Sequence, residues 1–161
     1  MGGKPVKQGD VSDMTYGEAE SNLILDRLIN QWAIDQDAGQ IADQLQLMAP
    51  DGTYRVYQGD QLVTETAGRE NLTRQFTTAA AARDQSFTMN GTHLITVNQN
   101  DGTATGIVYA QVKVVTARDN QRVVTNYSVR YHDQYAFLGA NWVIQERDEH
   151  RVIVDQHPLH A

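Results

Sequence analysis

The sequence predicts an α+β domain in which three helices from the N-terminal half pack on a strongly curved, mostly antiparallel sheet. Helical hydrophobic periodicity occurs within residues 18–83, whereas residues 86–154 alternate apolar and polar side chains at the period of strands. Helices followed by a run of strands are typical of α+β domains. A chain of 161 residues with 40% hydrophobic residues is long enough for one such domain.

The first helix is expected to start near Glu18, with Ser21 as a candidate N-cap. Four apolar residues recur at i, i+3, i+4 and i+7 and form an amphipathic stripe, namely Leu25, Leu28, Ile29 and Trp32. The stripe continues into Asp35 and Gln36, so polar groups occupy positions where apolar ones are expected. Either the helix end reaches the surface there, or these polar groups belong to a buried site.

Shorter elements complete the first half of the domain. A second helix is predicted over 40–48, and a turn then leads into a strand over 53–57. A return strand is predicted over 62–66. The alanine, arginine and glutamine content of residues 67–83 predicts a third helix.

Turn signals divide the second half into four long strands, which we expect at 86–98, 103–117, 121–137 and 142–154. Even positions of the second of these strands and odd positions of the third are apolar and should face the core. In the first, the odd positions are expected inside, and these include Phe87, Met89, His93, Ile95 and Val97. Strands of this length must bend around a single core, and a bent sheet covered by helices leaves a cavity.

The charge balance argues against several classes of partner. Thirteen Lys and Arg residues stand against twenty Asp and Glu, which gives a formal net charge of −7. Nucleic acid is therefore not an expected partner. The chain has no cysteine, no nucleotide-binding motif and no rigid histidine spacing for a metal, so we expect no metal and no other cofactor.

Three parts are expected along the chain. Residues 1–18 are predicted to form a flexible N-terminal arm, residues 19–154 the folded domain, and residues 155–161 a C-terminal tail. No apolar stretch reaches the roughly 20 residues that a membrane span needs. The N-terminus also lacks the apolar segment of a signal peptide, so a cytoplasmic protein without a membrane partner is expected.

Several short segments have a characteristic order and spacing. They are residues 32–37 at the end of the first helix, 49–54 at the step into a strand, 67–70 at the start of a helix, and 130–135 followed by 142–147. Together they resemble the SnoaL-like branch of the nuclear transport factor 2-like (NTF2-like) superfamily. The resemblance covers about residues 20–154 and implies a cone-shaped fold, usually dimeric, with an apolar pocket at its wide end.

This superfamily includes scytalone dehydratase, hexachlorocyclohexane dehydrochlorinase and polyketide cyclases. In the first two types, a histidine on the first long strand moves a proton, and an aspartate at the end of the first helix orients it. By resemblance Asp35 matches that aspartate, or Asp37 if the alignment shifts. The matching strand position is Met89, which is not a base, and His93 follows on the same predicted face.

Five residues are candidate catalytic residues, two of them by the resemblance and three from their predicted positions. Asp35 is the candidate base, and Tyr54 and Tyr131 are candidate donors to a ligand oxygen. His93 is an alternative base, and Arg147 matches a family arginine that could pair with Asp35. Each also has a structural interpretation: a solvated helix end for Asp35, core packing for the tyrosines and His93, and a salt bridge for Arg147.

The wall of the pocket is expected to be apolar and aromatic, formed by Trp32, Phe87, Met89, Ala110, Val112, Tyr127 and Val129. The resulting hypothesis is a protein that binds a small apolar or aromatic ligand and acts as a cofactor-independent lyase, isomerase or cyclase. The alternatives are a non-catalytic dimeric binding or scaffold domain, and a small subunit similar to the β subunit of ring-hydroxylating dioxygenases. A homodimer is expected through the outer face of the sheet, at Ile107, Tyr109 and Val124.

Overall fold

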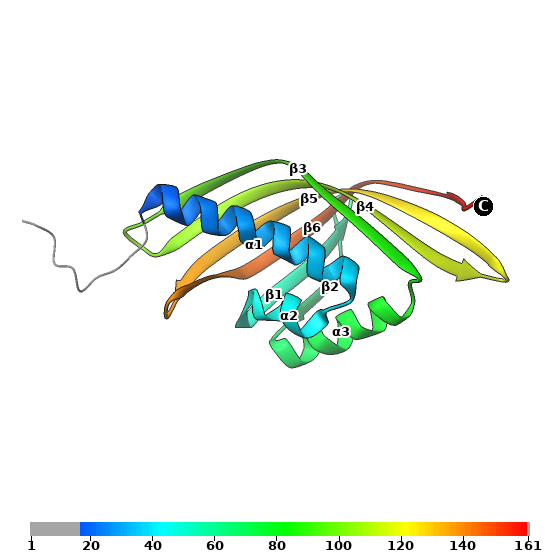
Figure 1. Ribbon diagram of the computed structural model, residues 1–161, viewed down its shortest axis with the longest axis horizontal. Helices are drawn as coiled ribbons and strands as arrows, with labels where there is room; N and C mark the ends of the chain where they lie inside the picture. The colour runs from blue at the N-terminus through cyan, green and yellow to red at the C-terminus, as the bar shows by residue number, and fades with distance from the viewer. Residues whose placement is uncertain (1–16, 161) are drawn as a thin grey trace, which may run out of the picture.

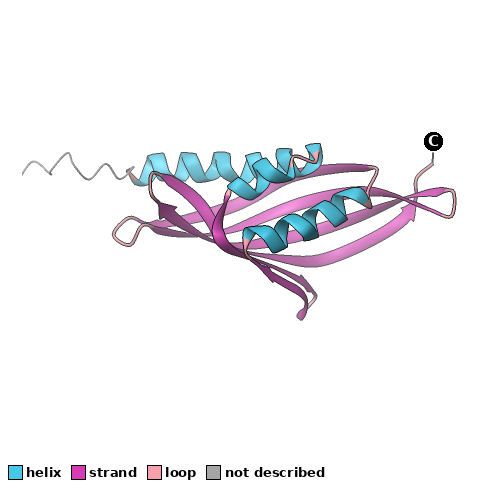
Figure 2. Ribbon diagram, turned by 90° about the horizontal axis from the view of Figure 1, so that it is seen from below, coloured by secondary structure: helices cyan, strands magenta, loops and turns pink. Residues whose placement is uncertain are grey.

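The computed structural model describes residues 17–160, in which three helices lie on one face of a curved six-stranded sheet (Figures 1 and 2). The elements are α1 (Glu18–Ala38), α2 (Ile41–Gln46), β1 (Met48–Gln58), β2 (Gln61–Ala67), α3 (Arg69–Ala81), β3 (Gln85–Asn98), β4 (Thr103–Arg118), β5 (Gln121–Leu138) and β6 (Asn141–Pro158). The strand order is β2-β1-β6-β5-β4-β3, and β1 and β6 are its parallel pair. The predicted fold class is confirmed. Of the predicted N-terminal arm, residues 1–16 lie outside the described residues.

The predicted apolar stripe of α1 faces the sheet, with Leu25, Ile29 and Trp32 buried. The helix begins at Glu18, so Ser21 is already within it and is not its N-cap. Instead, the Ser21 hydroxyl accepts a hydrogen bond of 3.2 Å from the indole N–H of Trp142. This contact joins the first turn of α1 to the start of β6. No helix within residues 17–160 is long and apolar enough to cross a membrane.

The second helix is shorter than predicted, because α2 ends at Gln46 and β1 starts at Met48. The predicted turn before the strand lies within β1, where the pairing with β6 is irregular between Met48 and Thr53. Gly52 lies in this irregular stretch. A Cβ at Gly52 would lie 3.0 Å from the carbonyl oxygen of Ala49, so close packing requires glycine there.

A β-bulge in β3 changes which side chains face the core. Asn90 pairs with Ala110 and His93 pairs with Val108. Between these two pairs, β3 therefore has one residue more than β4. One extra residue in a strand reverses the alternation of its side chains beyond that point. The alternation predicted for this strand therefore cannot hold along its whole length.

The bulge explains an error in the sequence prediction. Before the bulge the odd positions face outward, and Phe87 and Met89 are 62% and 58% exposed. After it, Ile95 and Val97 pack against the core as predicted. The inward orientation predicted for Phe87 and Met89 is wrong because it assumed an uninterrupted alternation.

The predicted faces of the next two strands are confirmed. Even positions of β4 are buried, including Val108 and Ala110, and odd positions of β5 are buried, including Val129. β6 continues to Pro158, opposite Val123 of β5, whereas the sequence predicted an end near residue 154 and a tail beyond it. The β5–β6 ladder therefore includes most of the segment predicted as a C-terminal tail.

Candidate functional site

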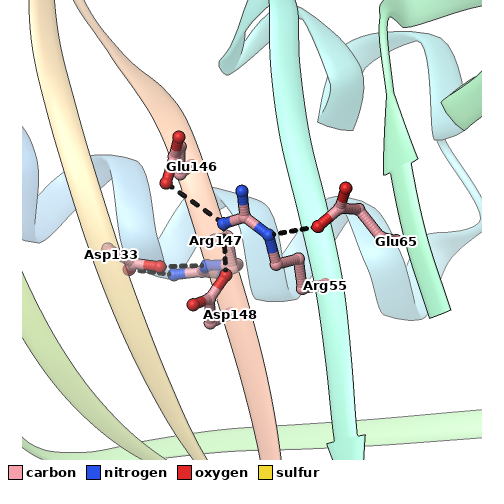
Figure 3. A network of polar contacts seen from close by, with 6 residues as sticks. All are labelled: Arg55, Glu65, Asp133, Glu146, Arg147 and Asp148. Atoms are coloured by element: carbon pink, nitrogen blue, oxygen red, sulfur yellow. Dashed lines mark hydrogen bonds and ion pairs between the residues drawn. The ribbon is translucent and has the colours of Figure 1, made fainter. Parts of the chain in front are cut away.

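An ion pair between β5 and β6 is enclosed by the helices and the sheet. Arg147 donates from Nε and Nη2 to the two carboxylate oxygens of Asp133, at 2.8 and 2.7 Å (Figure 3). The side chains of Arg147 and Asp133 are 2% and 0% exposed. Burial by itself lowers the pKa of Arg147, but the charge and hydrogen bonds of Asp133 raise it above its ordinary value. Arg147 is therefore a charged residue of the core.

Aromatic rings surround this ion pair. The guanidinium carbon of Arg147 lies 4.2 Å from the ring centre of Tyr131 and 5.0 Å from that of Trp32. The Tyr135 hydroxyl donates to Asp133 at 2.6 Å. Burial raises the pKa of Tyr131 and of Tyr135, so both phenols are protonated at neutral pH.

Beside this core, a cavity of about 250 Å³ lies between α3, the end of α1, α2 and the inner face of the sheet. Its apolar wall consists of Ile41, Val56, Phe76, Val112, Val114 and Val129, together with the ring of Tyr127. Its polar lining consists of Gln36, Gln44, Tyr54, Gln75, Arg83, Thr116, Glu149 and Arg151. Ala79 and Ala82 on its rim are exposed, so the cavity opens to solvent beside the end of α3.

Three polar side chains form a connected group on the cavity wall. The Tyr54 hydroxyl donates to Oε1 of Glu149 at 2.9 Å, and Nε of Arg151 donates to Oε2 of the same carboxylate at 2.8 Å. Burial raises the pKa of Tyr54 well above its ordinary value, and the charge of Glu149 adds to this effect. Burial lowers the pKa of Arg151, but Glu149 raises it and prevails. At neutral pH, Tyr54 is thus a neutral donor and Arg151 a cation.

Two further polar groups of the cavity have unused hydrogen-bonding capacity. Oε1 of Gln75 is buried and accepts no hydrogen bond within residues 17–160. Arg83, near the exposed rim, donates from Nη2 to the backbone carbonyl oxygen of Gln36 at 2.7 Å. Burial lowers the pKa of Arg83, and the charge of Asp37 opposes this effect. The cavity therefore offers both an acceptor and a cation to a ligand.

The expected candidate base, Asp35, is buried but is not among the residues that line the cavity in the described part of the chain. Its carboxylate accepts a hydrogen bond of 2.8 Å from Gln31, one turn earlier in α1. The expected pairing of Asp35 with Arg147 is absent, because Arg147 binds Asp133 with two nitrogens. At the end of α1, the side chain that lines the cavity is Gln36.

The alternative aspartate, Asp37, has a structural contact. Its carboxylate accepts hydrogen bonds from the hydroxyl groups of Ser86 and Thr88, at 2.7 and 2.9 Å, and from the backbone N–H of Thr88. These hydrogen bonds of Asp37 thus connect the end of α1 to the start of β3.

The expected alternative base, His93, lies outside the core. It forms an ion pair with Asp26 on α1, and its side chain is 35% exposed. His93 lies opposite the buried Val108, on the face of the sheet that the helices cover, as predicted. It is not among the residues that line the cavity in the described part of the chain.

The structure brings together only part of the predicted site. Tyr54, Val112, Tyr127 and Val129 line the cavity, whereas Trp32, Ala110, Tyr131 and Arg147 are buried without appearing among its lining residues. Phe87 and Met89, predicted for the wall, lie on the outer face of the sheet and are exposed.

Sequence reasoning missed three charged residues, of which one lies in the core and two line the cavity. Asp133 occupies an odd position of β5, among the apolar residues of its buried face. This position was itself the signal, because an acidic residue on an otherwise buried face needs a partner. Glu149 and Arg151 follow Arg147 at two-residue steps along β6, and this alternation could have placed all three on one face.

The opposite face of β6 carries a separate charged network. Arg55 of β1 contacts Glu65 at 2.7 Å, Glu146 at 3.1 Å and Asp148 at 3.1 Å (Figure 3). These contacts span β2, β1 and β6 and stabilise the parallel pairing of β1 with β6. Within residues 17–160, no group of three or more His, Cys, Asp or Glu side chains could hold a metal ion.

Comparison with known proteins identifies relatives of this chain. The family model of the SnoaL-like domain matches residues 18–148. No curated protein sequence matches the chain significantly. The match covers most of the described residues and agrees with the resemblance that the sequence segments suggested.

Three similar solved structures have low sequence identity. A protein from Novosphingobium aromaticivorans, provisionally named a scytalone dehydratase, is 10% identical with a TM-score of 0.71, over 89% of this chain and 90% of that one. Hexachlorocyclohexane dehydrochlorinase from Novosphingobium barchaimii is 13% identical with a TM-score of 0.71, over 88% and 91%. A protein from N. aromaticivorans, provisionally named the β subunit of an aromatic-ring-hydroxylating dioxygenase, is 15% identical with a TM-score of 0.67, over 85% and 90%. At such identities these likenesses show a shared fold.

Proposed function

The chain belongs to the SnoaL-like domain family, and from this premise we propose that it binds a small, largely apolar or aromatic molecule in its cavity. The supporting observation is a cavity of about 250 Å³ with an apolar wall and one connected polar group, Tyr54–Glu149–Arg151. An apolar cavity of about 150 Å³ holds benzene, so the volume suits one ring with substituents. Similar structures are named for scytalone dehydration and hexachlorocyclohexane dehydrochlorination, which favours a small organic ligand here.

The proposed chemistry is proton transfer without a cofactor, as in a lyase or an isomerase. Glu149 takes the role that the sequence suggested for Asp35, because it is the only carboxylate that lines the cavity within residues 17–160. It accepts the proton that leaves a ligand carbon. Once Glu149 holds the proton, the single hydroxyl hydrogen of Tyr54, which binds Glu149 in the structure, turns to a ligand oxygen and stabilises the negative charge that has developed there.

Paired variants test this proposal. Native mass spectrometry of the purified protein, followed by thermal shifts with a panel of one-ring and two-ring compounds, identifies a ligand. Glu149→Gln should abolish turnover of that ligand while retaining its binding. Asp35→Asn should retain turnover, because Asp35 hydrogen-bonds to Gln31 within α1. If no compound is retained or stabilises the protein, the proposed ligand binding is contradicted. If turnover is lost only in Asp35→Asn, Asp35 and not Glu149 is the base.

A second candidate function, association with another subunit, is favoured by the outer face of the sheet. Met89, Tyr109, Val152 and Ile153 together line a shallow groove on this face, and their exposed fractions are 58%, 45%, 47% and 62%. We propose that this apolar surface, which we call the outer patch, forms a homodimer contact. A subunit role, as in the similar dioxygenase β subunit, is the alternative. Val124, expected in the interface, is 7% exposed within the single chain and is not available for it.

A further inference from the structure

The cavity is positively charged although the protein as a whole is acidic. Its charged lining residues within 17–160 are Arg83, Glu149 and Arg151, so two cations accompany one carboxylate. The chain as a whole has a formal net charge of −7. Glu149 is paired with Arg151 at 2.8 Å, so Arg83 is the cavity cation that has no ion-pair partner among the described residues.

The surroundings of Arg83 compensate its charge only in part. Its hydrogen bond goes to a neutral acceptor, the backbone carbonyl oxygen of Gln36. Five other arginines form ion pairs within residues 17–160, whereas Arg83 forms none there. The negative charge of Asp37 acts on Arg83 without a direct contact, and the effect of burial on the Arg83 pKa exceeds it. Partial burial of an unpaired cation is unfavourable, and a bound anion would remove this cost.

The position of Arg83 relative to the apolar wall defines the shape of a suitable ligand. Arg83 lies just beyond the end of α3, next to the exposed rim residue Ala82, whereas Phe76, Val112 and Val129 form the wall. A ligand that satisfies both features has a charged end near the rim and a hydrocarbon ring against the wall. The planar fork of an arginine side chain matches the two oxygens of a carboxylate.

We propose that the ligand of the cavity is a small aromatic or alicyclic carboxylate, and that Arg83 binds its carboxylate near the rim. This inference rests on the proposed ligand binding and adds the charge class of the ligand and the residue that selects it. The Glu149–Arg151 pair remains at the wall, where its opposite charges neutralise each other.

Matched pairs of carboxylates and carboxamides test the inference, because they differ in charge but hardly in shape. The probes are benzoate and benzamide, phenylacetate and phenylacetamide, and cyclohexanecarboxylate and cyclohexanecarboxamide. Calorimetry on the full chain at neutral pH should give a carboxylate affinity at least about tenfold higher than that of the matched amide. Arg83→Gln should remove this preference, and Arg83→Lys should retain part of it.

Arg74→Gln is the matched control, because Arg74 lies on α3 and its side chain is 70% exposed. It should leave the carboxylate preference unchanged. Equal affinities for acid and amide, or a preference that survives Arg83→Gln in a folded variant, would overturn the inference while leaving ligand binding intact. Failure of all six compounds to bind would contradict the proposed ligand binding for one-ring molecules, and the inference with it.

Discussion

Asp133 and Arg147 neutralise each other's charge in the core. Both side chains are almost fully buried, and Arg147 uses two nitrogens to contact both oxygens of Asp133. Removing one partner of such a pair leaves an uncompensated charge, which is far more costly than replacing the whole pair by apolar residues. Substitution of Asp133 or Arg147 alone is therefore expected to cost more stability than substitution of both.

Asp133→Asn should destabilise the protein by about 3 to 5 kcal/mol, measured as the free energy of unfolding in urea. The amide retains the shape of the side chain but leaves the Arg147 charge unpaired. The double variant Asp133→Leu with Arg147→Met should recover most of this loss, because no buried charge remains. A loss below about 1 kcal/mol in Asp133→Asn would show that water reaches Arg147 in solution.

A pH effect is expected at His150, which stacks on Tyr57 with ring centres 4.5 Å apart. Burial lowers the pKa of His150, and the neighbouring His132 lowers it further, although Asp148 opposes this. The folded state therefore binds fewer protons than the unfolded state just below the unfolded pKa of about 6.5, so stability falls as the pH drops through this range. His150→Gln should make the melting temperature fall less steeply between about pH 7 and pH 5.

The matched control for His150 is His157→Gln, at the exposed end of β6. It should leave the steepness of the pH dependence as in the unmodified protein. An unchanged slope in His150→Gln would show that other groups cause the acid sensitivity.

At the scale of elements, contacts between α1 and the strands hold the helix on the sheet at both of its ends. The Trp142–Ser21 hydrogen bond lies at its start, and the Asp37 contacts with β3 lie at its end. Between them, Asn90 donates to the backbone carbonyl oxygen of Ile29 at 3.1 Å. The contacts of Asp37 and Ile29 use the inward side chains that β3 presents before its bulge, so the bulge and the position of α1 depend on each other.

Trp142→Ala should destabilise the protein by about 3 to 5 kcal/mol, through the cavity that it creates and the loss of the Ser21 contact. Trp142 is 7% exposed and packs edge-on against Phe137, with ring centres 5.6 Å apart. Leu94→Ala is the control, because Leu94 is 72% exposed on β3 and its truncation should change stability by less than about 0.5 kcal/mol. Equal denaturation midpoints for Trp142→Ala and the unmodified protein would contradict this account.

For the whole molecule, the helices cover one face of the sheet and leave the other face open (Figure 2). The outer patch lies on this open face. A homodimer that uses it is expected to bury on the order of 800 Å² per partner. Light scattering at micromolar concentration should therefore report twice the 18.0 kDa mass of the chain.

Met89→Glu and Ile153→Glu should convert the dimer to a monomer, because each would bury a charge in the apolar contact. Leu23→Glu is the control, since Leu23 is 72% exposed on α1, away from the outer patch. A monomer in the unmodified protein would contradict the proposed association, and a dimer that persists in both patch variants would place the contact elsewhere.

The elements and most of their buried faces follow from local sequence patterns. The α1 stripe and the alternation in β4 and β5 are local patterns, so the residues that share a face can be read from spacing. The SnoaL-like resemblance also followed from short segments. Four residues of the cavity wall, Tyr54, Val112, Tyr127 and Val129, were predicted from these patterns and that resemblance.

Which side chains meet depends on contacts between distant parts of the chain. A β-bulge is a property of the pairing between two strands, so a single sequence does not reveal that Phe87 and Met89 face outward. The partner of Arg147 is likewise determined across a ladder, where Asp133 lies directly opposite. The packing of α1, α2 and α3 on the sheet also brings Arg83 and Glu149, distant in sequence, to one cavity. Local periodicity specifies which side chains of one element share a face. Which of them contact another element depends on strand register and helix placement, and these are determined by long-range packing.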